Sequence, residues 1–561
     1  MQINYHKIIL ELEKILDGEV VFDRKTLEQH AIDASLFKII PQIVIYPKNK
    51  FDISKVVKYV NKLKSEDEQK YQGLSITARA AGTCMSGGSL NNSIILDVTK
   101  YLNKVEKLNT DYVVCEPGVY YRDLEKQMEK YNVFLPSYPA SKDLCCIGGI
   151  VSNNSAGEKT LVYGQTKDWL EEIEMILADG SMYNFKKLSF SELDNLLGSS
   201  VSNPFVKVIY RNIKKLIEEN REHISAQAPK VSKNSSGYNL WEAIDFESKS
   251  IDLCKLICGS QGTFGIITKI KLRLARRNKY TQMLTIFLPS LEKLVPVVQE
   301  VLKYEPESLE SYDDHTFKIA MKFLPTIIWK LKGSIWTLLW SFIPEAWLVL
   351  TGGVPKIILL AEFTGDSQGE ANQKALNAYK NTKKFGLKTR LTKNQTDINK
   401  YWLFRRESFN LLRSKLKGLR TAPFVEDVIV PIEAMAEFLP RMQKVLDDNN
   451  LTYTIAGHAG NGNFHIIPLM KLNSFKEVED IKRCNDKIFS LVRLYKGSIS
   501  AEHNDGLVRT PYLHYMFDKP MLELFSKTKS IFDPLSMFNP GKKVGGSVEG
   551  NYRQVNIVVE N

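Results

Sequence analysis

The sequence predicts an α+β protein with more than one domain. Strand and helix patterns are mixed along the chain without the regular alternation of a doubly wound parallel sheet. A chain of 561 residues is too long for a single ordinary core, so about two or three domains are expected. Hydrophobic residues make up 43% and charged residues 25%, the proportions of a folded chain rather than a disordered one.

The first third of the chain alternates between both kinds of element. Helical spacing of apolar residues covers 6–16 and 51–64, and the β-branched run at 42–48 predicts a strand that ends near Pro47. A strand is expected to enter the glycine-rich turn at 78–89, and another follows at 93–105. Residues 111–132 predict a strand, a turn and a helix.

Two later segments carry clear strand signals. Residues 173–185 predict a hairpin with Asp179 and Gly180 at its turn. In residues 265–277, apolar and basic residues alternate with the period of two that is typical of a half-buried strand. The alternating residues are Ile266, Thr268, Ile270, Leu272 and Leu274 on one side and Lys269, Lys271 and Arg273 on the other.

Cysteines and charge limit the classes of function. The seven cysteines form no CxxC pair, which argues against an iron–sulfur or zinc-ribbon site. Their odd number and the absence of a signal-peptide pattern at the start predict a reducing, cytoplasmic setting. The net charge of +12 is spread along the chain without a nucleic-acid-binding motif, so attraction to anionic membranes or acidic substrates is favoured and no nucleic-acid partner is expected.

A hydrophobic insertion is expected at about residues 320–360. It holds Trp329, Trp336, Trp340 and Trp347, with lysines nearby, and Pro344 and Glu345 interrupt its most apolar part. Interfacial membrane contact is the favoured interpretation. A buried core or partner surface and a true membrane span remain as alternatives.

The glycine-rich turn is neither of the two common phosphate-binding motifs. Gly82 and Gly87 have Walker spacing, but Gly88 stands where the lysine is required, and no GxGxxG precedes a helix. A nest of backbone N–H groups that binds a pyrophosphate beside Arg79 is one interpretation. A tight turn with no ligand is the other.

Further motifs follow this turn in a characteristic order: "EPGVYYRDLEK", "PSYPASKDLCCIGGIVSNNSAGEKTLVYG", "LADG" and "CGSQGTFGIITKIKLRL". From about residue 20 to 545 the chain resembles the FAD-linked D-2-hydroxyacid dehydrogenases, with the D-lactate dehydrogenases most similar among them. The resemblance implies a two-lobed FAD-binding domain of the vanillyl-alcohol oxidase and p-cresol methylhydroxylase type at 1–275. It implies an α+β substrate or cap domain at 276–500 and a C-terminal segment, 501–561, that returns to the FAD domain.

The same resemblance assigns the FAD contacts. It places the pyrophosphate against the glycine-rich turn and the flavin and ribityl chain against 139–157. The flavin turn contains no histidine, so a histidyl-linked flavin is not indicated, and Cys84, Cys145 and Cys146 are interpreted as small buried residues. The implied cofactor residues are Arg79, Gly82, Thr83, Cys84, Met85, Ser86, Gly87, Gly88, Pro139, Ala140, Ser141, Gly148, Gly149, Ser152, Asn153, Gly157, Gly259, Gly262, Ile266 and Asn539.

The stretch "GHAGNGNFH" brings two histidines close together. Its glycines argue against a helix, so we expect His458 in a loop and His465 at the start of a strand. Two ordinary loop histidines are one interpretation. With Glu502 as third ligand they would form a metal site of the kind found in zinc enzymes.

By the resemblance, His458, His465 and Glu502 match divalent-metal ligands, for zinc or alternatively manganese, and His503 matches the general base. Asn461 stands where the family commonly has aspartate. Arg405, in a W-x-x-R element with Trp402, matches the arginine that binds the substrate carboxylate; a solvated arginine is the alternative. The lysine that some members place before the "DVxxP" strand is missing, and Val425 and Glu426 occupy that stretch, which argues against a second substrate carboxylate.

The implied reaction is oxidation of a D-2-hydroxy acid, with D-lactate favoured, to the 2-keto acid by hydride transfer to flavin. No haem or iron–sulfur ligands are evident in the sequence, so electrons must pass to an external acceptor such as a membrane quinone. The expected location is cytoplasmic, with peripheral contact at the inner membrane face as an extension. Alternatives are oxidation of D-2-hydroxyglutarate or glycolate, transfer of electrons to oxygen, an alkyl-glycerone-phosphate synthase-like transferase, or a flavin-free binding protein.

Overall fold

The computed structural model describes residues 3–322, 353–403, 405 and 419–558. An N-terminal lobe holds a small mixed sheet of strand order β1-β2-β4-β3, in which β2, β4 and β3 run parallel. Its longest helix, α3, is capped at the N-terminus by Asn49, whose side chain accepts hydrogen bonds from the backbone N–H groups of Phe51 and Asp52. The elements of this lobe are α1 (Tyr5–Ile15), β1 (Glu19–Val21), α2 (Arg24–His30), β2 (Ile43–Tyr46), α3 (Lys50–Glu66), β3 (Ile76–Arg79) and β4 (Ile94–Asp97).

A second, antiparallel sheet follows, with strand order β5-β6-β13-β8-β9. The alternation predicted at 265–277 is confirmed, because Ile270 and Leu272 are buried while Lys269 and Lys271 are partly exposed. The predicted hairpin is formed by β8 and β9. The main elements are β5 (Val105–Leu108), β6 (Tyr112–Cys115), α4 (Tyr121–Glu129), α5 (Ile147–Asn153), α6 (Thr160–Tyr163), β8 (Leu170–Ile176), β9 (Met182–Lys186), α7 (Phe190–Gly198), α8 (Pro204–Glu219), α9 (Arg221–Gln227), α10 (Leu253–Ile257) and β13 (Ile266–Arg273).

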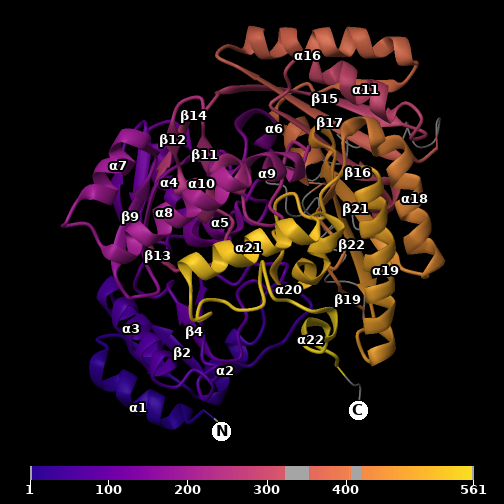
Figure 1. Cartoon of the computed structure of the whole chain (residues 1–561). Helices are drawn as coiled ribbons and strands as arrows, with labels where there is room; N and C mark the ends of the chain where they lie inside the picture. Colours follow the sequence, from indigo (N-terminus) through magenta and orange to yellow (C-terminus); the bar gives the residue numbers. More distant parts are fainter. Residues whose placement is uncertain (1–2, 323–352, 404, 406–418, 559–561) are drawn as a thin grey trace.

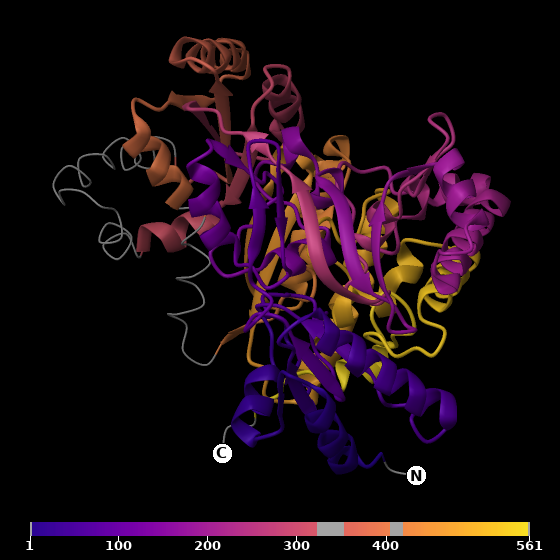
Figure 2. The same cartoon turned by 90° about the vertical axis from the view of Figure 1, so that its left-hand side faces the viewer.

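Short strands complete this half of the molecule. They pair as β10-β12-β11 and as β14-β7. Figure 2 shows the five-stranded sheet in the middle of the molecule, with the N-terminal lobe below it. The short strands are β7 (Val133–Phe134), β10 (Leu188–Ser189), β11 (Ile244–Asp245), β12 (Ser250–Ile251) and β14 (Ala275–Arg276).

A large antiparallel sheet begins at β15, with strand order β18-β15-β17-β16-β21-β22-β19 and β20 paired to β22. Its central strands β16 and β17 are buried along their whole length. The elements are β15 (Tyr280–Leu288), α11 (Leu294–Leu302), β16 (Ser308–Asp313), α12 (Asp314–Lys322), β17 (Ile357–Gly365), α16 (Gln368–Thr382), β18 (Lys388–Leu391), β19 (Arg420–Thr421), β20 (Val428–Ile429), α18 (Met435–Asp448), β21 (Thr452–His458), β22 (Asn463–Met470) and α19 (Phe475–Leu494).

The C-terminal segment crosses back over the first half of the chain. Helix α21 packs on α8, and Figure 1 shows it running across the face between the magenta and orange parts of the molecule. Met537 and Phe538 lie in the apolar core of the N-terminal lobe. The elements of this segment are α20 (Gly506–Arg509), α21 (Lys519–Phe532) and α22 (Val548–Tyr552).

The tryptophan-rich insertion expected at 320–360 lies mostly outside the described residues, which stop at 322 and resume at 353. Its four tryptophans therefore have no structural description. In the described parts of the chain, no helix combines the length and apolar character needed to cross a bilayer.

Candidate active site

A cavity of about 810 Å³ is lined by the first half of the chain and by the large sheet. Its size falls in the range of small-molecule and cofactor sites. Fourteen of the twenty residues expected to contact a cofactor line this cavity. They are Arg79, Gly82, Thr83, Cys84, Met85, Gly88, Pro139, Ala140, Ser141, Gly148, Gly149, Ser152, Asn153 and Gly262.

The other six expected cofactor residues are not among the lining residues. Asn539 donates from Nδ2 to the carbonyl oxygens of Gly88 (2.8 Å) and Gln261 (2.7 Å), so it ties two cavity loops together. Ser86 is fully buried and donates to the carbonyl oxygen of His503 at 3.2 Å. The full set of six is Ser86, Gly87, Gly157, Gly259, Ile266 and Asn539.

Glycines leave room in the wall itself. A Cβ added at Gly149 or Gly262 would meet no atom nearer than 3.8 Å and 4.0 Å respectively. Protein packing therefore does not require glycine there, and the adjacent open space belongs to the cavity. Gly82 and Gly87 have φ values of +66° and +80°, the left-handed conformation used in backbone nests that bind phosphate. The wall fits a dinucleotide such as FAD.

Arg79 has a second role beyond the one expected. Its guanidinium donates to the carbonyl oxygens of His30 (3.2 Å) and Ile32 (2.7 Å) while its side chain lines the cavity. Arg79 therefore also holds the loop that follows α2 against the glycine-rich turn.

Gly157 provides a direct test of the cavity wall. A Cβ there would lie 2.2 Å from the carbonyl oxygen of Tyr138, so Gly157→Ala must push the 138–141 segment away. Overpacking of this kind costs about 1–3 kcal/mol, or roughly five- to 150-fold in FAD affinity if the displaced wall contacts the cofactor. Flavin absorbance per protein measures the loss. Gly198→Ala, with no atom within 4 Å, is the matched control, and equal FAD retention in both variants would contradict the expectation.

The two histidines of "GHAGNGNFH" lie on a hairpin. His458 is the last residue of β21 rather than a loop residue, so that expectation is wrong; His465 lies near the start of β22, opposite Ala456. The turn is formed by a short 3-10 segment and by Gly462 at φ +74°. At Gly457 a Cβ would lie 2.2 Å from the carbonyl oxygen of Asn463, so the close strand pairing requires glycine there.

His458, His465 and Glu502 converge in the cavity. The Nε2 atoms of His458 and His465 lie 3.2 Å and 3.3 Å from the same oxygen, Oε1 of Glu502. One ligand atom from each of the three residues lies within 4.8 Å of the other two. Two imidazole nitrogens and a carboxylate aimed at one point are the donor set of a divalent-metal site, so these residues fit the expected ion.

The other carboxylate oxygen of Glu502 is held by a buried lysine. Lys233 donates to Oε2 at 2.7 Å. Burial alone would raise the pKa of Glu502, but Lys233 and His458 outweigh it and hold the pKa well below its usual range. Among the described residues, Asn461 forms no hydrogen bond with either histidine. Its Nδ2 donates instead to the hydroxyl of Ser232, beside Lys233, at 3.1 Å.

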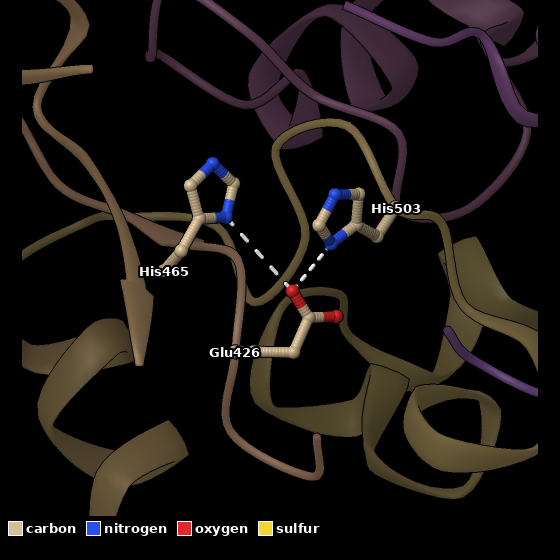
Figure 3. A group of neighbouring side chains, drawn as sticks. All are labelled: Glu426, His465 and His503. Atoms are coloured by element: carbon tan, nitrogen blue, oxygen red, sulfur yellow. Dashed lines mark hydrogen bonds and ion pairs between the residues drawn. The ribbon is translucent and has the colours of Figure 1, made fainter. Parts of the chain in front are cut away.

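A second group shares His465 with the first. Figure 3 shows Glu426 between His465 and His503; Glu426 accepts a hydrogen bond from Nδ1 of His503, and its nearer oxygen is 3.9 Å from Nδ1 of His465. Arg509 donates to the other oxygen of Glu426 at 2.6 Å. Both oxygens of Glu426 thus have partners within the protein, and His465 is common to the two groups.

The surroundings of His503 favour its protonated form. Burial by itself lowers the pKa of His503, but the carboxylates of Glu426 and Asp427 outweigh burial and raise it to about 9. The ring also stacks on His465, with centroids 5.1 Å apart. Since Glu426 accepts from Nδ1, the Nε2 atom is the one available to act on a ligand.

Asp427 fixes the turn that carries Glu502 and His503. Its Oδ2 accepts hydrogen bonds from the backbone N–H groups of Glu502 (2.9 Å) and His503 (2.7 Å) and from the Ser500 hydroxyl (2.8 Å). Asp427 adopts φ +72°, an uncommon conformation for a residue other than glycine. The adjacent residues Glu426 and Asp427 thus position His503 from two sides.

Arg405 lines the same cavity and is paired with a buried carboxylate, Glu310 of β16. Trp402, three residues earlier, donates from its indole nitrogen to Glu362 at 2.9 Å. Lys159, just beyond the flavin-side turn, donates to the other oxygen of Glu362 at 2.6 Å. The W-x-x-R element is therefore attached to both halves of the molecule.

Sequence motifs did not identify four residues that hold the site together: Lys233, Glu310, Glu426 and Asp427. An acidic residue in the middle of a strand that is otherwise suited to burial, "SLESYD", is a detectable signal for Glu310. For Lys233 no local pattern separates it from surface lysines.

Two sequence profiles match the chain. One, described as the FAD binding domain, matches residues 41–186, and the other, described as the C-terminal domain of FAD linked oxidases, matches residues 277–543. Among solved structures, p-cresol methylhydroxylase with substrate bound has a TM-score of 0.67 at 15% identity, covering 96% of each chain. The 4-ethylphenol oxidase from Gulosibacter chungangensis has a TM-score of 0.66 at 15% identity, covering 96% of this chain and 97% of its own.

Curated relatives carry two kinds of name. The D-2-hydroxyglutarate dehydrogenase of Pseudomonas putida is 24% identical over 95% of this chain and 51% of its own length. The D-lactate dehydrogenase of Archaeoglobus fulgidus is 24% identical over 90% of this chain and 91% of its own length. The chain thus spans only about half the length of the Pseudomonas relative.

The fold and the glycine-lined cavity define an FAD-binding protein of the vanillyl-alcohol oxidase and p-cresol methylhydroxylase type, and the α+β fold class predicted from the sequence is confirmed. Within that class, the chain combines an FAD binding domain with the C-terminal domain of FAD linked oxidases, in agreement with the resemblance seen in its motifs.

Proposed function

We propose that this protein is an FAD-dependent dehydrogenase that oxidises a D-2-hydroxy acid, with D-lactate preferred, to the 2-keto acid. One observation carries the proposal. Arg405, His503 and the triad of His458, His465 and Glu502 line the same cavity as the glycine-rich turn, so groups for a carboxylate, a hydroxyl proton and a metal face the space suited to FAD. The names of the relatives support this class of substrate.

Each of these cavity residues has a distinct role in the proposed reaction. The planar fork of Arg405 binds the substrate carboxylate. His503, held through Nδ1 by Glu426, takes the hydroxyl proton at Nε2 when its ring is neutral, a form that predominates only above its pKa of about 9. A divalent ion, zinc or alternatively manganese, would be held by His458, His465 and Glu502 and would polarise the substrate hydroxyl. FAD supplies the acceptor for the hydride from the substrate carbon. The cavity wall orients the substrate between these groups.

Glu426 favours a substrate with a single carboxylate. It lines the cavity as a fully buried carboxylate whose pKa is held well below its usual range: burial opposes ionisation, but His503 and Arg509 outweigh it. Glu426 stands where some members of the family have a lysine, so the chain offers no cation at that position for a second substrate carboxylate. D-2-Hydroxyglutarate is the second candidate, because several relatives carry that name.

Anaerobic bleaching of the flavin by a panel of hydroxy acids tests the proposal. We expect D-lactate to bleach the flavin at least about tenfold faster than D-2-hydroxyglutarate, since burying a second carboxylate without a cationic partner costs more than about one kcal/mol. L-Lactate and glycolate complete the panel. Bleaching by the L-isomer alone would overturn the stereochemistry, faster bleaching by D-2-hydroxyglutarate would favour the second candidate, and a flavin that no hydroxy acid bleaches would refute the proposed activity.

The electron acceptor belongs to the same proposal. An external acceptor such as a membrane quinone would reoxidise the reduced flavin, and peripheral contact through the tryptophan-rich insertion at about 320–360 would bring a cytoplasmic enzyme to it.

A further inference from the structure

Glu310 connects two parts of the site that have different tasks. Glu310 lies on β16 and is only 1% exposed to solvent. Each of its two carboxylate oxygens has its own partner. Oε1 accepts a hydrogen bond from Nδ1 of His458 at 2.7 Å, and Oε2 forms an ion pair with Arg405. His458 belongs to the metal triad, and Arg405 is the proposed carboxylate-binding residue.

Strand pairing explains why Glu310 reaches His458. β16 and β21 are antiparallel neighbours with Ser311 opposite Gly457, so Glu310 stands across from His458 at the next position of the register. The contact is therefore built into the sheet. A buried carboxylate with no partner would be costly, and both partners of Glu310 among the described residues line the cavity.

The hydrogen bond from His458 to Glu310 determines which ring nitrogen of His458 carries the proton. Because Nδ1–H donates to Glu310, the neutral ring presents its lone pair at Nε2, the atom that lies 3.2 Å from Glu502. A carboxylate behind a metal-binding histidine fixes its tautomer and orientation and raises its basicity. Glu310 thus has the geometry of a carboxylate that supports a metal ligand.

The ion pair with Glu310 holds the guanidinium of Arg405 in a defined orientation at the cavity. It is formed by Nη2 of a rigid, planar group that carries five N–H donors. A 2-hydroxy acid carries its carboxylate and hydroxyl on adjacent carbons, so the groups that bind them must be held at a fixed short spacing. One carboxylate bonded to both Arg405 and His458 provides this spacing.

We propose that Glu310 is a positioning residue that couples the metal triad to the carboxylate-binding arginine, so that a change at either end is transmitted to the other. This inference rests on the proposed function. It does not depend on which hydroxy acid is the substrate.

The test measures metal affinity rather than turnover. Purified FAD-loaded protein is stripped of metal, and Zn²⁺ affinity is determined by competition with a chromophoric chelator. Glu310→Gln keeps the shape of the side chain, but its amide has only one oxygen that can accept a hydrogen bond. We expect the affinity for Zn²⁺ to fall about 10- to 100-fold while FAD is retained. Glu300→Gln is the matched control, since Glu300 is also a buried glutamate of this domain but pairs with Lys303 and Lys384.

A double-mutant cycle tests the coupling itself. Arg405→Met should weaken Zn²⁺ binding several-fold in the wild-type background and should have no further effect once Glu310 is glutamine. Additive effects, or unchanged Zn²⁺ affinity in E310Q, would overturn the inference. If E310Q fails to retain FAD, Arg405→Met is tested alone. Unchanged Zn²⁺ affinity in Arg405→Met would then overturn the inference.

The wild-type protein separates this inference from the function on which it rests. A wild type that neither binds Zn²⁺ nor is bleached by any hydroxy acid refutes the proposed function. A wild type that does both, with E310Q equal to E300Q in Zn²⁺ affinity, refutes only the role of Glu310.

Discussion

Replacing His503 by asparagine is expected to lower the rate of anaerobic flavin reduction by about 10²–10⁴-fold while FAD remains bound. That range is typical for loss of a general base. His503 is suited to the role because Glu426 fixes Nδ1 and Asp427 fixes its backbone N–H at 2.7 Å, so Nε2 is presented to the cavity in a defined direction. The arrangement resembles the carboxylate that orients histidine in hydrolase triads.

Stopped-flow absorbance of the flavin with saturating D-lactate measures this loss. His514→Asn is the matched control, because His514 is an exposed histidine whose Nδ1 is hydrogen-bonded to the carbonyl oxygen of Pro511, outside the cavity. The absorbance spectrum before mixing checks that each variant holds FAD. If His503→Asn reduced its flavin as fast as the control, another group would have to be the base.

Removal of the metal is expected to slow flavin reduction by about 10³-fold. Polarisation of an oxygen by a bound ion is worth several kcal/mol, and each 1.36 kcal/mol is tenfold in rate. Protein dialysed against a chelator should recover its rate when Zn²⁺ or Mn²⁺ is added back.

His465→Ala separates this effect from damage by the chelator. His465 supplies Nε2 at 3.3 Å from Glu502, so the variant should bind the ion weakly and stay slow after the metal is restored. His6→Ala is a control on the opposite lobe, in α1. Equal rates for metal-free and metal-loaded wild type would show that the triad does not serve catalysis.

Prediction from sequence succeeded where function depends on local backbone geometry. The glycine-rich turn at 78–89 needs left-handed residues at Gly82 and Gly87, and that requirement is visible in the sequence itself. The strand alternation at β13 and the hairpin of β8 and β9 follow from local patterning in the same way. Motif order then indicated an FAD-linked enzyme, and the profile matches confirm its two FAD-linked domains.

Prediction was weaker where a residue acts through a distant partner. The glycines around His458 argue against a helix and so predict a loop, yet Gly457 permits the close pairing of β21 with β22, and Gly462 takes the positive-φ position of the turn between them. In the sequence, Glu426 stands out only because it lies where some members of the family have a lysine. Its bonds to His503 and Arg509 involve residues about 80 positions away, and no local pattern encodes such contacts.

The sequence by itself determined the family, the α+β class and the positions of the turns that shape the cavity, because these depend on the conformational limits of neighbouring residues. The tertiary structure decided which charged groups are buried together. Glu310 meets His458 and Arg405, and Lys233 meets Glu502, only because strands and loops far apart in the chain are packed side by side. The bonding and pKa of a buried charge depend on those neighbours.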